Sequence, residues 1–252
     1  MMIMKNFKNI LYLEIDNSKQ LNTIIIPGFL QTNQTYQNLF KTIGQYSNIY
    51  FIEIPGFGIT EKLEEVVNLD YYVLWLKEFI EYLNLKNVIL FGHSFGGRVI
   101  VKYESLYNSS KRLILMDSAG CTRRSLKTKF KIIKYKVLKY TFKTLRLKKQ
   151  YNLLINNSGT EDYKKLDNIS KQTFSNIVKE KTIKYLKNIQ TVTLILWGQL
   201  DKQTPYEDGL LINKKIKNST LIKIDDVGHF PHLEKSYLIN QIIDNFYRGG
   251  CL

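Results

Sequence analysis

Short apolar runs alternate with amphipathic segments along most of the chain. The run NVILF at 87–91 is rich in β-branched and aromatic residues, which is typical of a buried strand. Similar runs occupy 10–15, 23–27, 48–55, 112–116, 193–197 and 220–224. Because apolar strands separated by helices are typical of a sheet covered on both faces, the pattern predicts an α/β fold with a mostly parallel, doubly wound sheet. Only one strand is predicted before 23–27, so we expect a shortened first hairpin.

Amphipathic periodicity predicts the helices between these strands. Residues 70–83 repeat apolar side chains on one helical face, and Asp70 is the predicted N-cap. Helices are also predicted at 97–107, 206–216 and 234–247.

The alternation is interrupted once, between 121 and 190, where only helical patterns occur. We therefore expect one core made of 1–120 and 191–252, with 121–190 inserted as a helical cap. This insert holds 19 Lys and Arg against 4 Asp and Glu, whereas the rest of the chain holds 18 of each. All of the net charge of +15 thus lies on the insert.

A glycine-flanked serine marks the junction between a predicted strand and a predicted helix. Residues 92–96, Gly-His-Ser-Phe-Gly, match the pattern G-x-S-x-G, in which a sharp turn raises the serine hydroxyl above the sheet. Side chains two residues on either side of Ser94 would clash, so glycine is suited to both places. The helix that follows directs the backbone N–H of Phe95 toward charge developing on a substrate oxygen. Ser94 is therefore a candidate nucleophile.

A serine nucleophile needs a base that is held by a third group. The chain has three histidines, and His93 is expected to point away from its neighbour Ser94. His229 lies in the loop after the last predicted strand, and Asp201 lies in the loop after the preceding one. Both loops are at the carboxyl ends of parallel strands, where open α/β sheets bind ligands. The order Ser94, Asp201, His229 is that of one known class of catalytic triad.

Other residues compete for these roles. His232 is the only other candidate base, but it follows a proline at the predicted start of the last helix, which favours a structural role. Asp117, at the end of strand 112–116, remains an alternative orienting acid. Asp225 and Asp226 precede His229 too closely and are predicted to be turn residues.

Several other classes of protein are not favoured. No metal site is expected, because His229 and His232 flank a proline without a helical carboxylate pair. Residues 56–61, GFGITE, lack the third glycine of a dinucleotide fingerprint, and no P-loop pattern occurs, so no cofactor is predicted. No apolar run approaches the roughly 18 residues of a membrane span, and no secretory signal is recognised. Cys121 and Cys251 form no motif, and the predicted compartment is the cytoplasm.

Five segments together resemble the α/β-hydrolase superfamily, in particular its small cap-bearing members. They are IIIPGF, IEIPGFGIT, GHSFGGR, LILWGQLDKQTP and GHFPHLEK, and they span most of the chain outside the insert. The resemblance implies that Ser94 is the nucleophile, Asp201 the acid and His229 the base. It also implies an oxyanion hole formed by the backbone N–H groups of Phe29 and Phe95.

One departure from the family pattern affects the oxyanion loop. The family usually has His-Gly after the strand that precedes this loop, and here the residues are Pro27-Gly28. Since the expected donor is a backbone N–H one residue further on, the hole is retained, and we expect different support for the loop.

The most basic part of the insert is 123–149, with 12 Lys and Arg and no acidic residue. A set of apolar residues falls on one helical face: Leu126, Phe130, Ile133, Val137 and Tyr140. We expect this face to roof the active site, with the lysines in solvent. The alternatives are peripheral contact with an anionic membrane and attraction of anionic substrates. Nucleic acid is not expected as a partner, because no recognised nucleic-acid module is present.

The sequence thus predicts a serine hydrolase of an ester or similar acyl bond, whose small-molecule substrate carries an apolar acyl or aryl group. A carbon–carbon bond hydrolase of the same fold is the alternative, because substrate choice resides in the cap. A non-catalytic protein that docks on anionic lipid or a partner through the basic cap is an alternative of another class. The sequence does not predict an oligomeric state.

Overall fold

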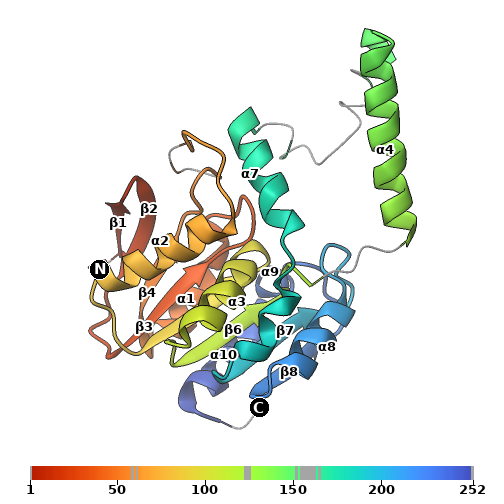
Figure 1. Ribbon diagram of the computed structural model, residues 1–252. Coiled ribbons are helices and arrows are strands. Elements are labelled where there is room, and N and C mark those ends of the chain that lie inside the picture. Colours follow the sequence, from red (N-terminus) through yellow and green to blue (C-terminus); the bar gives the residue numbers. More distant parts are fainter. Residues whose placement is uncertain are drawn as a thin grey trace.

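Eight strands in the described residues form one sheet in the order β1-β2-β4-β3-β5-β6-β7-β8 (Figure 1). The computed structural model describes residues 2–57, 60, 62–121, 126–150, 153, 163 and 166–250. The strands are β1 Met2–Phe7, β2 Ile10–Ile15, β3 Leu21–Ile26, β4 Ser47–Ile52, β5 Val88–His93, β6 Arg112–Met116, β7 Thr193–Gly198 and β8 Ser219–Ile224. All neighbours from β4 to β8 pair in parallel, so the predicted α/β fold is confirmed.

The first hairpin is complete, and the prediction of a shortened one was wrong. β1 pairs with β2 antiparallel over its whole length, and β2 pairs antiparallel with β4. Residues Met2 to Lys5 of β1 are exposed, so the strand lacks the buried apolar run that identifies the others. Its two-residue turn, Lys8 and Asn9, has positive φ angles of 49° and 62°, which suit a tight hairpin.

Helices cover both faces of the sheet, and each face has its own apolar core. Helices α2 (Leu69–Tyr82), α3 (Phe95–Tyr107) and α8 (Tyr206–Lys215) pack on one face. Helices α1 (Gln37–Ile43) and α10 (Ser236–Arg248) pack on the other, preceded by the short helix α9 (Pro231–Glu234). This double covering explains why the central strands β5 and β7 are buried along their whole length, whereas the edge strand β8 is only partly buried.

Helix α2 begins at Leu69, one residue before the predicted start. Its N-cap is Asn68, whose side chain accepts a hydrogen bond from the Tyr71 backbone N–H. Asp70, the predicted cap, lies in the first turn and pairs with Lys102 at 2.7 Å. The cap prediction was therefore wrong, because the helix already begins at the buried Leu69, which the predicted apolar pattern did not include.

The described residues between β6 and β7 are helical or irregular, with no strand among them. They include α4 (Leu126–Thr144), α7 (Asn168–Lys179) and the 3-10 helices Thr182–Lys184 and Leu186–Asn188. Hydrogen bonds to the core hold both ends of helix α7. The Ser170 hydroxyl donates to the Gly56 carbonyl, and Arg98 Nη1 donates to the Ile177 and Glu180 carbonyls at 3.1 and 2.6 Å.

Helix α4 stands away from the rest of the molecule (Figure 1). The predicted helix is present, but Val137 is 57% exposed and Tyr140 is 74% exposed, so the expected roof over the active site is not formed by this face. The side chains of Leu126, Phe130 and Ile133 lie outside the described part. No described helix has the length and apolar character that a membrane span requires.

Candidate active site

Ser94 occupies a strained turn between β5 and α3. Its φ and ψ angles are 48° and −106°, which place the side chain at the carboxyl end of the sheet. On both sides of Ser94, the backbone passes very close to other backbone atoms. A Cβ on Gly96 would lie 1.8 Å from the Ile26 carbonyl oxygen, and one on Gly92 would lie 2.6 Å from the Gly97 Cα. The predicted reason for both glycines is confirmed.

The predicted convergence of three distant side chains is present. His229 Nε2 lies 2.9 Å from Ser94 Oγ, and His229 Nδ1 lies 2.6 Å from Asp201 Oδ2. A carboxylate only accepts, so Nδ1–H donates to Asp201, and the bare Nε2 accepts from the Ser94 hydroxyl. His229 and Asp201 are buried, and Ser94 is partly accessible. The arrangement thus couples a hydroxyl to an imidazole of fixed tautomer.

Asp201 is held as a carboxylate by several donors. Its Oδ1 accepts the backbone N–H groups of Gln203 at 2.7 Å and Thr204 at 3.0 Å. The Thr204 hydroxyl donates to Oδ2 at 2.5 Å. Burial by itself raises the pKa of Asp201, but the hydrogen bonds and charge of His229 and the Thr204 donors outweigh it, and the pKa lies below its usual value. Asp201 therefore stays ionised beside His229.

Asp117, the alternative acid, does not bond the imidazole. Its Oδ1 accepts the Gly198 backbone N–H at 2.9 Å, and its Oδ2 has no hydrogen-bond partner among the described residues. Complete burial, opposed by the Gly198 hydrogen bond and reinforced by Asp201, raises its pKa well above the usual value. The geometry therefore selects Asp201 as the partner of His229.

The described residues offer one group of metal-type ligands, formed by Asp117, Asp201 and His229. Their ligand atoms lie within 4.8 Å of one another. However, His229 Nδ1 and Asp201 already face each other at hydrogen-bond distance, so an ion between them would displace the shared proton. The ligand atoms of His229 and Asp201 are therefore already engaged with each other.

The backbone around His229 is fixed from two sides. Glu234 accepts the N–H groups of Gly228 and Phe230, at 2.8 and 3.1 Å, through its two carboxylate oxygens. His93 Nε2 lies 2.8 Å from the His229 carbonyl oxygen. As predicted, the His93 side chain points away from Ser94, into the interior. Glu234 was not predicted, although it lies close to His229 in the sequence, within the segment GHFPHLEK.

His232, the rival base, is buried and makes no polar contact within the described ranges. Both ring nitrogens lack a hydrogen-bond partner among the described residues, and the ring stacks on Tyr36 with centroids 4.6 Å apart. Burial, and to a lesser extent the neighbouring His229, lowers its pKa to about 4. A neutral, stacked imidazole without a partner has the structural role expected for His232.

Gln31 supports the oxyanion loop, and sequence reasoning missed it. Its Oε1 accepts the Gly28 backbone N–H at 2.9 Å and the Tyr36 hydroxyl at 2.7 Å, and it lies 2.6 Å from His93 Nδ1. Burial keeps the pKa of His93 well below normal, and a neutral ring can donate to only one of its two oxygen neighbours. Gln31 thus holds the loop that carries Phe29, and the His93 ring lies between Gln31 and the loop that carries His229.

The two amides expected to form an oxyanion hole border the same cavity as Ser94. The backbone N–H groups of Phe29 and Phe95 have no acceptor within the described ranges, and Phe95 is the first residue of α3. The cavity holds about 520 Å³ beneath α7. Its wall is mostly apolar and aromatic and is made of Phe29, Ser94, Phe95, Arg98, Ala119, Gly120, Tyr163, Phe174, Val178, Gln203 and Thr204.

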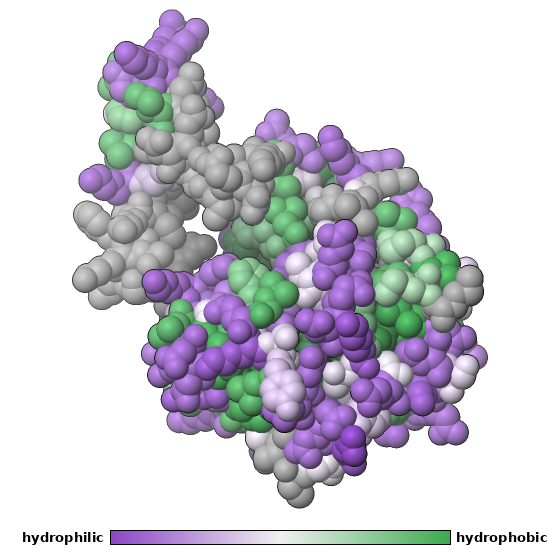
Figure 2. All heavy atoms as spheres, turned by 180° about the vertical axis from the view of Figure 1, so that it is seen from behind, coloured by the Kyte–Doolittle hydropathy of each residue, from purple (hydrophilic) through white to green (hydrophobic). Residues whose placement is uncertain are grey.

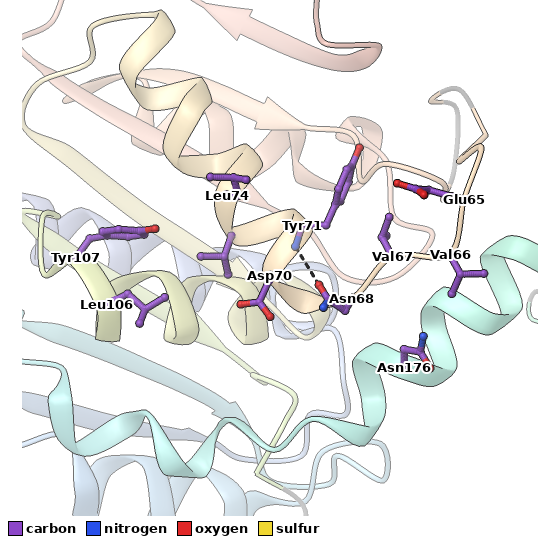
Figure 3. Close-up of a pocket in the computed structure, with 11 residues that line it drawn as sticks. Glu65, Val66, Val67, Asn68, Asp70, Tyr71, Leu74, Leu106, Tyr107 and Asn176 are labelled. Atoms are coloured by element: carbon purple, nitrogen blue, oxygen red, sulfur yellow. Dashed lines mark hydrogen bonds between the residues drawn. The ribbon is translucent and has the colours of Figure 1, made fainter.

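A second hollow lies between the start of α2, the end of α3 and α7 (Figure 3). It holds about 560 Å³, and its exposed apolar side chains include Leu74 and Leu106. Its wall contains no serine, cysteine or histidine. Its acidic residues are Glu65 and Asp70, and Asp70 is engaged with Lys102. This hollow therefore lacks the groups that the chemistry requires, although it is slightly larger than the cavity at Ser94.

A sequence profile of the alpha/beta hydrolase fold matches residues 24–236, most of the chain. The chain is 27% identical to the pimeloyl-[acyl-carrier protein] methyl ester esterase of Wigglesworthia glossinidia brevipalpis, over 93% of this chain and 96% of that protein. It is 26% identical to the 2-hydroxy-6-oxononadienedioate/2-hydroxy-6-oxononatrienedioate hydrolase of Escherichia coli, over 87% and 83%. The crystal structure of a putative lipase from Acinetobacter baumannii superposes with a TM-score of 0.75 at 22% identity, over 99% and 91%.

Proposed function

The chain belongs to the alpha/beta hydrolase fold family, and from that premise we propose that it is a serine hydrolase of an ester or similar acyl bond. The observation that carries the proposal is the pair of contacts at His229, 2.9 Å to Ser94 Oγ and 2.6 Å to Asp201 Oδ2. A hydroxyl becomes a nucleophile when a base of this kind removes its proton.

In the proposed mechanism, Ser94 Oγ attacks the substrate carbonyl carbon while His229 Nε2 takes the hydroxyl proton. The Asp201 carboxylate stabilises the imidazolium that results and keeps Nδ1 protonated. The backbone N–H groups of Phe29 and Phe95 hold the oxyanion of the tetrahedral intermediate. His229 then gives its proton to the leaving oxygen, and the carbon–oxygen bond breaks. A water molecule activated by the same imidazole releases the acyl group from Ser94.

The shape and lining of the cavity favour a substrate with an apolar acyl or aryl group. Phe29 and Phe174 have ring centroids 4.6 Å apart, and Phe57 packs against Phe29 at 5.0 Å. The rings of Phe29 and Phe174 form an apolar part of the cavity wall that Ser94 also borders, and Phe57 supports them from behind. Arg98 also borders the cavity, but its guanidinium donates to the two carbonyls at the end of α7, so we assign it a role in positioning this wall.

Labelling by a fluorophosphonate probe tests the proposed nucleophile. The wild-type protein is expected to be labelled, and Ser94→Ala is expected to lose all labelling. Ser109→Ala, at an exposed serine outside the cavity, is the matched control and retains labelling. Labelling that persists in Ser94→Ala, or a wild-type protein that is not labelled, contradicts the proposal.

Hydrolysis of a carbon–carbon bond is the second candidate, because the E. coli relative is named for hydrolysis of hydroxy-oxo dienedioates. The same three side chains would serve, and the difference resides in what the cavity accepts. Turnover of short p-nitrophenyl esters is compared with turnover of a vinylogous diketone. We expect the esters to be the better substrates; a strong preference for the diketone favours the second candidate.

A further inference from the structure

A basic arm, defined here as residues 134–149, projects from the hydrolase core. It contains no acidic residue, whereas its described side chains include six exposed cations: Lys134, Lys139, Lys143, Arg146, Lys148 and Lys149. Exposed apolar residues are interleaved with them: Val137, Tyr140, Leu145 and Leu147. In Figure 2, hydrophilic and hydrophobic atoms lie side by side on the projecting part of the molecule.

This composition is costly for an arm surrounded by water. A solvated helix face ordinarily pairs lysines with acidic residues three or four positions away, and like charges at that spacing, such as Lys139 and Lys143, repel each other. Within the described ranges, none of the six cations forms an ion pair. Val137 and Tyr140 also leave more than half of their surface in solvent. A partner that is both anionic and apolar would relieve both costs.

We propose that the basic arm docks on the surface of a bilayer that contains anionic lipids. At such a surface the cations meet headgroup phosphates, while the aliphatic and aromatic side chains enter the boundary with the acyl chains. Tyrosine suits this boundary because its ring is apolar and its hydroxyl stays hydrated. A nucleic acid or an acidic protein surface would attract the cations but would offer no apolar environment to Val137 and the exposed leucines. Either is therefore a poorer partner than a lipid surface.

The distribution of charge across the chain also favours this partner. Outside 121–190 the numbers of basic and acidic residues are equal, so attraction to an anionic surface acts on the insert and orients the molecule with its arm toward the lipid. Since no described helix is suited to span a membrane, the attachment is peripheral. The contact is independent of the reaction at Ser94, which faces the cavity beneath α7.

Sedimentation with vesicles tests the proposal on the full chain. We expect binding to phosphatidylcholine vesicles that contain phosphatidylglycerol, little binding to phosphatidylcholine alone, and loss of binding at high salt. Each cation near an anionic surface is worth about fivefold in partitioning. The variant K134E/K139E/K143E should therefore partition at least ~100-fold less. V137S/Y140S tests the apolar part and should also bind more weakly.

The matched control is K214E/K215E/K217E, which makes the same change of charge at exposed lysines near the end of α8. It should bind vesicles almost as well as wild type. Unchanged turnover of a soluble ester in all three variants shows that they are folded. The proposal is overturned if phosphatidylglycerol does not increase binding, or if the control loses as much binding as the arm variant. Binding of duplex DNA by the wild type without vesicle binding also overturns it.

Discussion

Replacing His232 by phenylalanine should make the protein more resistant to acid while leaving catalysis intact. The ring of His232 is 1% exposed, has no hydrogen-bond partner among the described residues, and stacks on Tyr36. Phenylalanine can keep the stacking and cannot take up a proton. Because His229, not His232, contacts Ser94, kcat for an ester should change by less than threefold, roughly the scatter of conservative substitutions.

The expected magnitude follows from the pKa of His232. Folding lowers it from the usual value of about 6.5 to about 4, so between these values the unfolded chain binds a proton that the folded chain does not. The stability due to the neutral ring is complete above about pH 6.5 and is lost as the pH falls toward 4. One pKa unit corresponds to about 1.4 kcal/mol, so the total is about 3 kcal/mol and the loss at pH 5.5 is about 1.4 kcal/mol.

Urea unfolding at pH 7.5 and 5.5 measures this difference. The free energy of unfolding should fall between the two values by about 1.4 kcal/mol more in the wild type than in His232→Phe. Titrating groups remote from His232 are present in both proteins and cancel in the comparison. His232 contributes to the lowered pKa of His93, but burial is the larger cause and remains in the variant. Equal losses in the two proteins would refute the reasoning, because they would mean that His232 is protonated as easily in the folded chain as in the unfolded one. A large fall in kcat would reassign the base.

Two further pairs of substitutions test the acid of the triad and the support of the oxyanion loop. Asp201→Asn should lower kcat about 10³- to 10⁴-fold, because the carboxylate that keeps Nδ1 of His229 protonated is lost. Asp117→Asn should keep kcat within about tenfold of the wild-type value. Steady-state kinetics that reverse this order would make Asp117 the acid. Gln31→Leu should lower kcat about 10- to 100-fold by displacing the backbone amide of Phe29. The control Gln34→Leu, at an exposed position, should leave kcat unchanged. Equal kinetics of the two variants would show that Gln31 does not support the oxyanion loop.

Most of the sheet and the central site were predictable because their signals are local and strong. Five of the six parallel strands contain a run of at least four buried residues, and the sharp turn at Ser94 imposes glycine at 92 and 96. The positions of Asp201 and His229 follow from topology, since loops after parallel strands meet at one edge of the sheet. The proximity of these side chains to Ser94 could therefore be predicted from the order of the strands.

Other features depend on contacts that no local pattern records. β1 is exposed along most of its length, so it lacks the run of buried apolar residues from which a strand is predicted. Gln31 is an ordinary polar residue after a loop glycine, and its importance arises from three groups that only the fold brings to its carbonyl oxygen. The apolar spacing of 126–140 predicts an amphipathic helix, and the helix α4 is present there. The same spacing does not specify what the apolar face will meet, and the expected roof was wrong for that reason.

The clustering of imidazoles has a practical consequence for spectroscopy. All three histidines of the chain lie together, with the His93 ring centroid 5.0 Å from that of His229 and 5.1 Å from that of His232. No surface histidine exists to confuse a spectrum, so every imidazole proton resonance reports on the neighbourhood of the serine. A proton NMR titration of the unlabelled protein can therefore follow an inhibitor or substrate analogue as it enters, without any engineered reporter.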